Sequence, residues 1–112
     1  MTTEEIRFYR KRAETLKALA NPYRIWIVEK LAEGELCICE FNKALDLDYS
    51  TISRHLSVLR NAGIVDYRKE GKQVFYSLRT PCILSFLKCF DEVVKMNVEQ
   101  GNEYLNNREA GK

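Results

Sequence analysis

The sequence predicts a mostly helical α+β fold, in which four helices precede one small β-hairpin and a last helix. Hydrophobic residues recur at helical spacing over residues 3–20, 22–32, 37–45 and 50–62. The period then changes to alternation over 64–69 and 73–78, which is typical of two strands joined by a turn. Pro81 opens another segment with helical spacing. The expected order of elements is therefore ααααββα.

The chain length of 112 residues predicts a single domain. We expect this domain to cover residues 1–96 and to be followed by a polar tail over 97–112 that frays. No apolar run approaches the roughly 20 residues that cross a bilayer, and the first residues do not form a secretory signal. The sequence therefore predicts a cytoplasmic protein that does not enter a membrane.

The last helix carries more apolar surface than a terminal helix of a small monomer can bury. Its apolar stripe consists of Ile83, Phe86, Leu87, Phe90, Val93 and Val94. A helix packed only on its own domain is the alternative. Because a domain of this size buries a limited share of its surface, we favour a homodimer formed through the first and last helices.

The segment 50–62 is expected to form an amphipathic helix. Its apolar face consists of Ile52, Leu56 and Leu59. Asp48 or Ser50 can cap the start of the helix by accepting a hydrogen bond from a free backbone N–H. Gly63 follows the last turn, where a left-handed residue commonly ends a helix.

The opposite face of this helix can form hydrogen bonds, is partly cationic and contains no acidic residue. Its candidate DNA contacts are Tyr49, Ser50, Thr51, Ser53, Arg54, His55 and Arg60. An ordinary surface helix of this size usually carries some acidic residues. We therefore expect a helix that lies in the major groove of double-stranded DNA. His55, the only histidine, is expected to be a DNA or structural contact rather than a metal ligand.

Basic residues are concentrated in two stretches, although the net charge is only +2. The stretch 49–79 holds six Lys and Arg residues against two acids, and 1–30 holds seven against four. The predicted hairpin places Arg68, Lys69 and Lys72 near its tip. A helix-turn-helix followed by a basic hairpin is a winged helix-turn-helix, and its hairpin adds contacts to phosphates or the minor groove. These three residues are therefore further candidate DNA contacts.

Cys37 and Cys39 provide two sulfur atoms at short spacing, and thiolates favour soft ions. Side chains two residues apart point to different sides of a helix but share a face in extended backbone. The two cysteines can therefore hold one ion only where the backbone is extended or unwound, and unwinding is easiest at a helix N-terminus. The neighbouring acids would raise the thiol pKa values and a helix N-terminus would lower them. Two small buried core residues are the alternative interpretation.

Cys82 and Cys89 are seven residues apart, which separates them by roughly 10 Å on a helix. We therefore do not expect one ion to bind both. Cys89 borders the apolar stripe and is interpreted as a buried interface residue. Cys82 stays open as a third metal ligand.

Three stretches of the chain resemble the ArsR/SmtB family of small dimeric repressors, and the resemblance extends over about residues 10–95. They are residues 18–24, 35–41 and 50–65. The second resembles the cysteine box of the family's arsenic- and soft-metal-sensing members, except that Asn42 stands where their third cysteine is expected. A third ligand would then come from Cys82, Cys89, a small thiol or solvent. The resemblance implies a homodimer that sits on operator DNA and leaves it when an inducer binds.

We therefore expect a transcriptional repressor that leaves DNA when arsenite or antimonite binds the cysteines, with Cd(II), Pb(II) and Zn(II) as further inducers. An alternative keeps the DNA-binding fold and makes the thiols a redox or persulfide sensor. A small Cys-x-Cys thiol oxidoreductase is a third hypothesis, but the chain lacks a thioredoxin-like βαβ pattern. The sequence thus favours a regulator over an enzyme.

Overall fold

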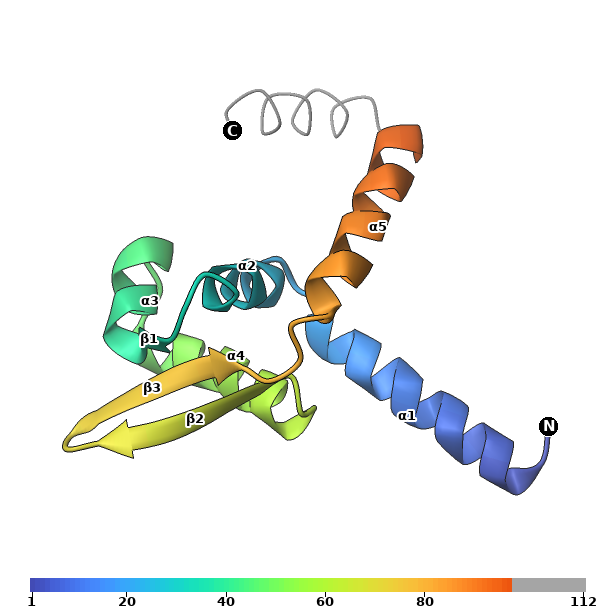
Figure 1. The fold of residues 1–112 in the computed structure, drawn as a ribbon, viewed down its shortest axis with the longest axis horizontal. Helices are drawn as coiled ribbons and strands as arrows, with labels where there is room; N and C mark the ends of the chain where they lie inside the picture. The colour runs from blue at the N-terminus through green and yellow to red at the C-terminus, as the bar shows by residue number, and fades with distance from the viewer. Residues whose placement is uncertain (98–112) are drawn as a thin grey trace. The chain divides into compact units, whose positions relative to one another are not determined.

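The computed structural model describes residues 1–97, so the predicted polar tail over 97–112 lies outside the described residues except for Asn97. The elements, drawn in Figure 1, are α1 (Thr3–Leu19), α2 (Pro22–Leu31), β1 (Leu36–Cys37), α3 (Ile38–Leu45), α4 (Tyr49–Asn61), β2 (Val65–Glu70), β3 (Gln73–Leu78) and α5 (Ile83–Asn97). One compact unit ends at Thr80 and holds α1 to α4 with the sheet, and a second begins at Pro81 and holds α5. The predicted mostly helical fold with a hairpin is confirmed.

The three strands form an antiparallel sheet in the order β1-β3-β2. The hairpin of β2 and β3 is the predicted one, and Gly71 takes the left-handed φ of +64° that its turn requires. Strand β1 was not predicted, because two residues are too few to show alternation. It pairs Leu36 with Tyr76 and Cys37 with Phe75. Cys37 of the cysteine box therefore lies in an edge strand, beside the hairpin of β2 and β3 that forms the wing.

The apolar face of α4 forms the centre of the first unit. Ile52, Leu56 and Leu59 are all 0% exposed, as the sequence predicted. Helices α2 and α3 both contact α4, and Phe41 of α3 is buried with its ring 6.5 Å from that of Trp26. Helix α3 thus packs directly on α4.

Ala44 of α3 is exposed, although the helical spacing of apolar residues over 37–45 would turn it inward with Phe41. The helix has only eight residues, and only Ile38 and Phe41 among them are buried. A helix this short presents one narrow side to the core, so the helical spacing of apolar residues overestimates how many of them are covered.

Asp48 caps α4, which decides between the two caps that the sequence allowed. Its carboxylate accepts a hydrogen bond of 3.0 Å from the N–H of Thr51. Hydrogen bonds from Thr51 lower the pKa of Asp48, because they favour the charged carboxylate. The helix ends before Gly63, whose φ of +80° is in the left-handed region.

Helices α1 and α5 leave most of their apolar side chains uncovered within the chain. In α1 only Ala18 and Leu19 are buried, whereas Tyr9 and Leu16 are exposed. Helix α5 begins at Ile83 rather than at Pro81 and exposes Phe86, Phe90, Val93 and Val94. No helix in the described part of the chain has the length and apolar character needed to span a membrane.

Replacing Leu56 by alanine is expected to lower the free energy of unfolding by about 2–5 kcal/mol, because a fully buried side chain leaves a cavity. The adjacent Ser57 is exposed and gives a matched control, with Ser57→Ala expected within about 0.5 kcal/mol of the parent. Urea unfolding at one fixed protein concentration measures both changes. Similar unfolding midpoints for the two variants would contradict the packing of this face.

Candidate nucleic-acid interface and thiol pair

Five of the seven polar residues predicted on the α4 surface lie on its outer side. Tyr49, Ser50, Arg54 and Arg60 are exposed, and Ser53 is half-buried. Helical spacing puts them on adjacent rows of one surface. The acid at the N-terminus of α4 is its cap, Asp48, and no acidic residue follows it in the first turn. This surface has the donors and charge that a major groove requires.

His55 lies on the side of α4 that turns toward α2, and Thr51 lies one turn before it. Thr51 serves the Asp48 cap. The His55 ring stacks on the Tyr23 ring with centroids 5.7 Å apart, and its Nδ1 lies 3.4 Å from Nη1 of Arg24. Both residues are half-buried, and the contacts they make are within the protein.

The pKa of His55 is lowered from its usual value, first by burial and then by the charges of Arg24 and Arg54. Each of these disfavours the imidazolium form. The ring is therefore neutral at neutral pH, and it adds no positive charge to the surface of α4.

An aromatic cluster joins α4 to the wing. The guanidinium of Arg60 lies over the ring of Tyr67 at 4.1 Å from its centroid, which is a cation–π contact. The Tyr67 ring in turn lies 5.8 Å from the Tyr76 ring on β3. Burial raises the pKa of Tyr76. The Tyr67 ring of β2 thus orients the Arg60 side chain, which belongs to the exposed surface of α4.

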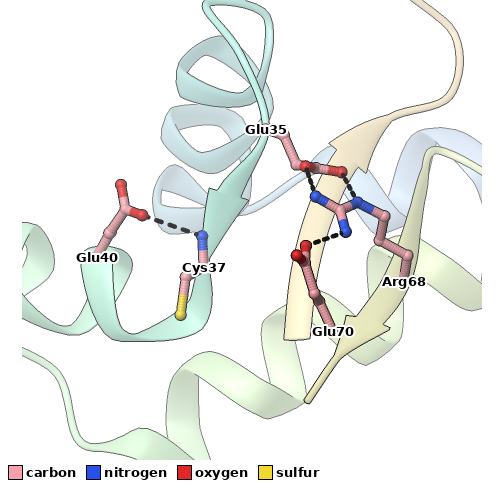
Figure 2. Close-up of polar contacts among 5 residues, drawn as sticks. All are labelled: Glu35, Cys37, Glu40, Arg68 and Glu70. Carbon is pink, nitrogen blue, oxygen red and sulfur yellow. Dashed lines mark hydrogen bonds and ion pairs between the residues drawn. The ribbon is translucent and has the colours of Figure 1, made fainter. Parts of the chain in front are cut away.

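Arg68 is held by two carboxylates on the wing surface (Figure 2). Its Nε and Nη2 donate to Glu35 at 3.0 and 2.7 Å, and its Nη1 donates to Glu70 at 2.6 Å. These bonds lower the pKa of Glu35 and raise that of Arg68. Of the three wing cations that the sequence indicated, Lys69 and Lys72 are exposed, and Arg68 has its charge balanced locally.

Sequence reasoning did not find Glu35 as a partner of Arg68, since 33 residues separate the two. The only sequence signal was that Glu35 opens the cysteine box. The contact depends on the pairing of β1 with β3, which the sequence did not predict.

The sulfur atoms of Cys37 and Cys39 lie 2.9 Å apart. Cys37 has extended backbone, with φ −80° and ψ 150°, and it is the N-cap of α3, in whose first turn Cys39 lies. The extended backbone that two such cysteines need in order to share an ion is therefore present at Cys37. Cys37 is buried and Cys39 is exposed. The N–H of Cys37 donates to the Glu40 carboxylate at 3.3 Å (Figure 2).

The pKa of Cys39 is raised from its usual value. The main cause is its hydrogen bond with Cys37, followed by desolvation and by the charges of Cys37 and Glu40. The competition between acids and helix terminus is thus decided at Cys39 in favour of the protonated thiol. An ion that binds this sulfur must displace a proton, which makes its affinity rise with pH.

A third ligand is not assembled around the two sulfurs. Within residues 1–97, no group of three His, Cys, Asp or Glu side chains is placed to hold a metal ion. Asn42, at the position of the missing third cysteine, donates its side-chain N–H to the backbone oxygen of Leu47 and so serves the end of α3. Cys82 and Cys89 belong to the second unit and are exposed within the chain.

A helix-turn-helix with an acid-free outer surface and a basic hairpin defines a DNA-binding transcriptional regulator rather than an enzyme. Residues 21–67, from the cap of α2 into β2, match the family described as bacterial regulatory protein, arsR family. The chain belongs to this ArsR family of transcriptional repressors.

Three relatives carry the assignment over most of the chain. An uncharacterized HTH-type transcriptional regulator, MJ1325, of Methanocaldococcus jannaschii is 41% identical over 86 residues, which are 76% of this chain and 97% of the relative. The cadmium resistance transcriptional regulatory protein CadC homolog of Staphylococcus aureus is 41% identical over 88% of this chain and 71% of its own. The arsenical resistance operon repressor of Escherichia coli is 38% identical over 84% and 81%.

Solved structures support the same fold. NolR from Sinorhizobium fredii matches with a TM-score of 0.74 at 27% identity, over 83% of this chain and 93% of that one. The homodimeric winged helix-turn-helix domain of Mb0332 from Mycobacterium bovis matches with a TM-score of 0.75 over 88% and 95%. Its identity of 24% makes it evidence for the fold alone.

Lys72→Ala is expected to weaken binding to operator and to unrelated DNA alike, because a lysine on the wing tip would contact phosphate. The slope of log K against log salt should fall by about 1, the amount for one lost phosphate contact. Fluorescence anisotropy at several salt concentrations measures the slope. Lys88→Ala on α5 removes the same charge as a control. An unchanged slope for Lys72→Ala would contradict the wing assignment.

His55→Gln is expected to flatten the pH dependence of stability in acid. Because the folded-state pKa of His55 lies below its usual value, its contribution to stability is present above that usual pKa and is lost as pH falls through the folded-state pKa. Unfolding midpoints in urea at about pH 7 and pH 5 give the comparison, since unperturbed carboxylates titrate lower. An equal decrease in midpoint for both proteins would contradict a neutral, stacked His55.

Proposed function

We propose that this repressor is a homodimer that leaves its operator when As(III) or another soft metal(loid) ion binds the thiolates of Cys37 and Cys39. The observation that carries the proposal is the 2.9 Å separation of the two sulfur atoms where β1 passes into α3. The thiols lie at the start of α3, and α3 packs on α4, the proposed recognition helix. The segment that carries the two thiols therefore also begins the helix that positions α4.

The two thiols fit a soft ion by chemistry and by distance. Two thiolates on one tetrahedral ion with bonds of about 2.3 Å lie about 3.8 Å apart. The two sulfur atoms, now 2.9 Å apart, therefore need to move apart by only about 0.9 Å to hold such an ion. Soft sulfur ligands suit As(III), antimonite, Cd(II), Pb(II) and Zn(II). The third ligand is supplied by Cys82, Cys89, a small thiol or solvent. The names of the cadmium and arsenical resistance relatives support an inducer of this class.

Helix α3 links the thiol pair to α4, the helix proposed to contact DNA. Cys37 is the N-cap of α3, and Phe41 one turn later is fully buried beside Trp26. A change in the backbone at Cys37 and Cys39 moves the start of α3 and with it the Phe41 contact. Because α3 packs on α4, the orientation of the reading helix then changes. A homodimer needs both reading helices at a fixed spacing, so this change weakens binding.

The DNA surface and the dimer are parts of the same proposal. Tyr49, Ser50, Ser53, Arg54 and Arg60 face the major groove, and Lys69 and Lys72 face phosphates beside it. His55 supports the helix from the side of α2, and Thr51 serves its N-terminal cap. The exposed apolar side chains of α1 and α5 form the dimer interface in this proposal. A regulator of this kind acts where the DNA is, in the cytoplasm.

A redox or persulfide sensor is the second candidate, and the same sulfur distance favours it. At 2.9 Å the pair is not bonded, since a disulfide measures about 2.05 Å, but little movement separates the two states. An oxidant such as a peroxide or polysulfide would then replace the ion. The two candidates differ in whether release needs oxidation.

The double variant Cys37→Ser/Cys39→Ser is expected to bind operator DNA as the parent does and to lose its response to arsenite and Cd(II). In the parent we expect the ion to weaken DNA binding by about 5–150-fold, the usual range for coupled sites. Anaerobic anisotropy titration with a reductant present measures the response. Cys89→Ser is the matched control and should respond as the parent does.

Each possible result of this titration supports one candidate. Release by arsenite or Cd(II) without oxidant supports the ion sensor, whereas release only by peroxide or polysulfide supports the redox sensor. A double variant that still responds to all of these agents would contradict any role of the two thiols.

A further inference from the structure

One row of residues crosses the whole sheet and begins at the thiol pair. Cys37 of β1 pairs with Phe75 of β3, and Phe75 pairs with Arg68 of β2. Residues paired in this way point to the same face of a sheet. The position that carries one of the sulfurs is therefore in register with Arg68 at the far edge.

The Arg68 side chain bridges this row. Its guanidinium lies over the Phe75 ring at 4.8 Å from the centroid and reaches Glu35, two residues before Cys37. Glu70, two residues along β2, holds the guanidinium from the other side (Figure 2). The wing edge and the start of the cysteine box are thus joined both by the β1–β3 pairing and by a side-chain bridge.

The neighbouring row leads from the same strand to the reading helix. Leu36 pairs with Tyr76, which pairs with Tyr67, and Arg60 of α4 lies over the Tyr67 ring. Consecutive rows of a sheet point to opposite faces. One face of the sheet therefore carries the bridge to Glu35, and the other carries the contact with α4.

We propose that Glu35 and Arg68 are positioning residues that transmit the state of the Cys37–Cys39 pair to the wing, so that inducer binding moves the wing as well as α4. This inference rests on the proposed function. It assigns Arg68 to the connection within the protein, in place of the phosphate contact predicted from the sequence.

The geometry of the bridge suits this role. The fork of Arg68 donates two parallel hydrogen bonds to Glu35, which fixes its orientation as a single bond would not. Single exposed ion pairs contribute little, but this one is bidentate, belongs to a network with Glu70 and stacks on an aromatic ring. Lysine cannot replace arginine in such a contact.

The test measures ion binding and DNA binding separately in Glu35→Gln. Cd(II) is the probe, its affinity is measured by titration of the thiolate absorbance, and DNA affinity is measured with and without it. We expect Cd(II) affinity and ion-free DNA affinity to stay within about twofold of the parent, while the ratio of the two DNA affinities falls by about fivefold. Glu33→Gln removes the same charge from a carboxylate paired with Lys30, and it should behave as the parent.

Arg68→Lys and amide hydrogen exchange give independent measurements. Arg68→Lys keeps the positive charge, and its ratio of DNA affinities should fall as in Glu35→Gln, with no further decrease in the double variant. In the parent, Cd(II) should change exchange at residues 65–78, and Glu35→Gln should remove that change.

Two results would overturn the inference while leaving the sensor in place. One is a Glu35→Gln variant with the full parental ratio of DNA affinities, and the other is unchanged exchange over 65–78 when the parent binds Cd(II). A parent that does not bind Cd(II), arsenite or Zn(II) at all would instead overturn the proposed function, and this inference with it.

Discussion

The pairing of β1 with β3 is the constraint on which the rest of the site depends. It holds Cys37 in extended backbone at the point where α3 begins, and this brings its sulfur beside that of Cys39. On an uninterrupted helix the two side chains would diverge. The same pairing brings Glu35 to Arg68. A strand of two residues therefore sets both the thiol geometry and the connection to the wing.

The reading helix combines a rigid inner face with a polar outer one. Three fully buried side chains, Ile52, Leu56 and Leu59, fix its rotation about its own axis. Because that rotation is fixed, Arg54 points outward and His55 points toward α2. Packing thus divides neighbouring residues of similar polarity into an exposed surface and a support for the helix.

The basic side chains of the wing and α4 also differ in whether a neighbouring group pairs with them. Lys69 and Lys72 are exposed at the hairpin tip, whereas Arg68 between two carboxylates contributes little field to an approaching phosphate. Arg60 is oriented by an aromatic ring. Counting positive charges along the chain could not separate exposed cations from those that hold the wing.

The sequence alone determined the order of the main elements, the buried face of α4, the hairpin and its turn, and the family. The elements follow from periodicity and turn residues, which are local properties, and the family follows from the resemblance of three stretches of the chain. Strand β1, the choice of Asp48 as cap, the Glu35–Arg68 bridge and the approach of Cys37 to Cys39 were decided only by the tertiary structure. Each depends on contacts between segments or on the exact path of a short backbone stretch. A pattern of residue types along the chain carries no information about such distances.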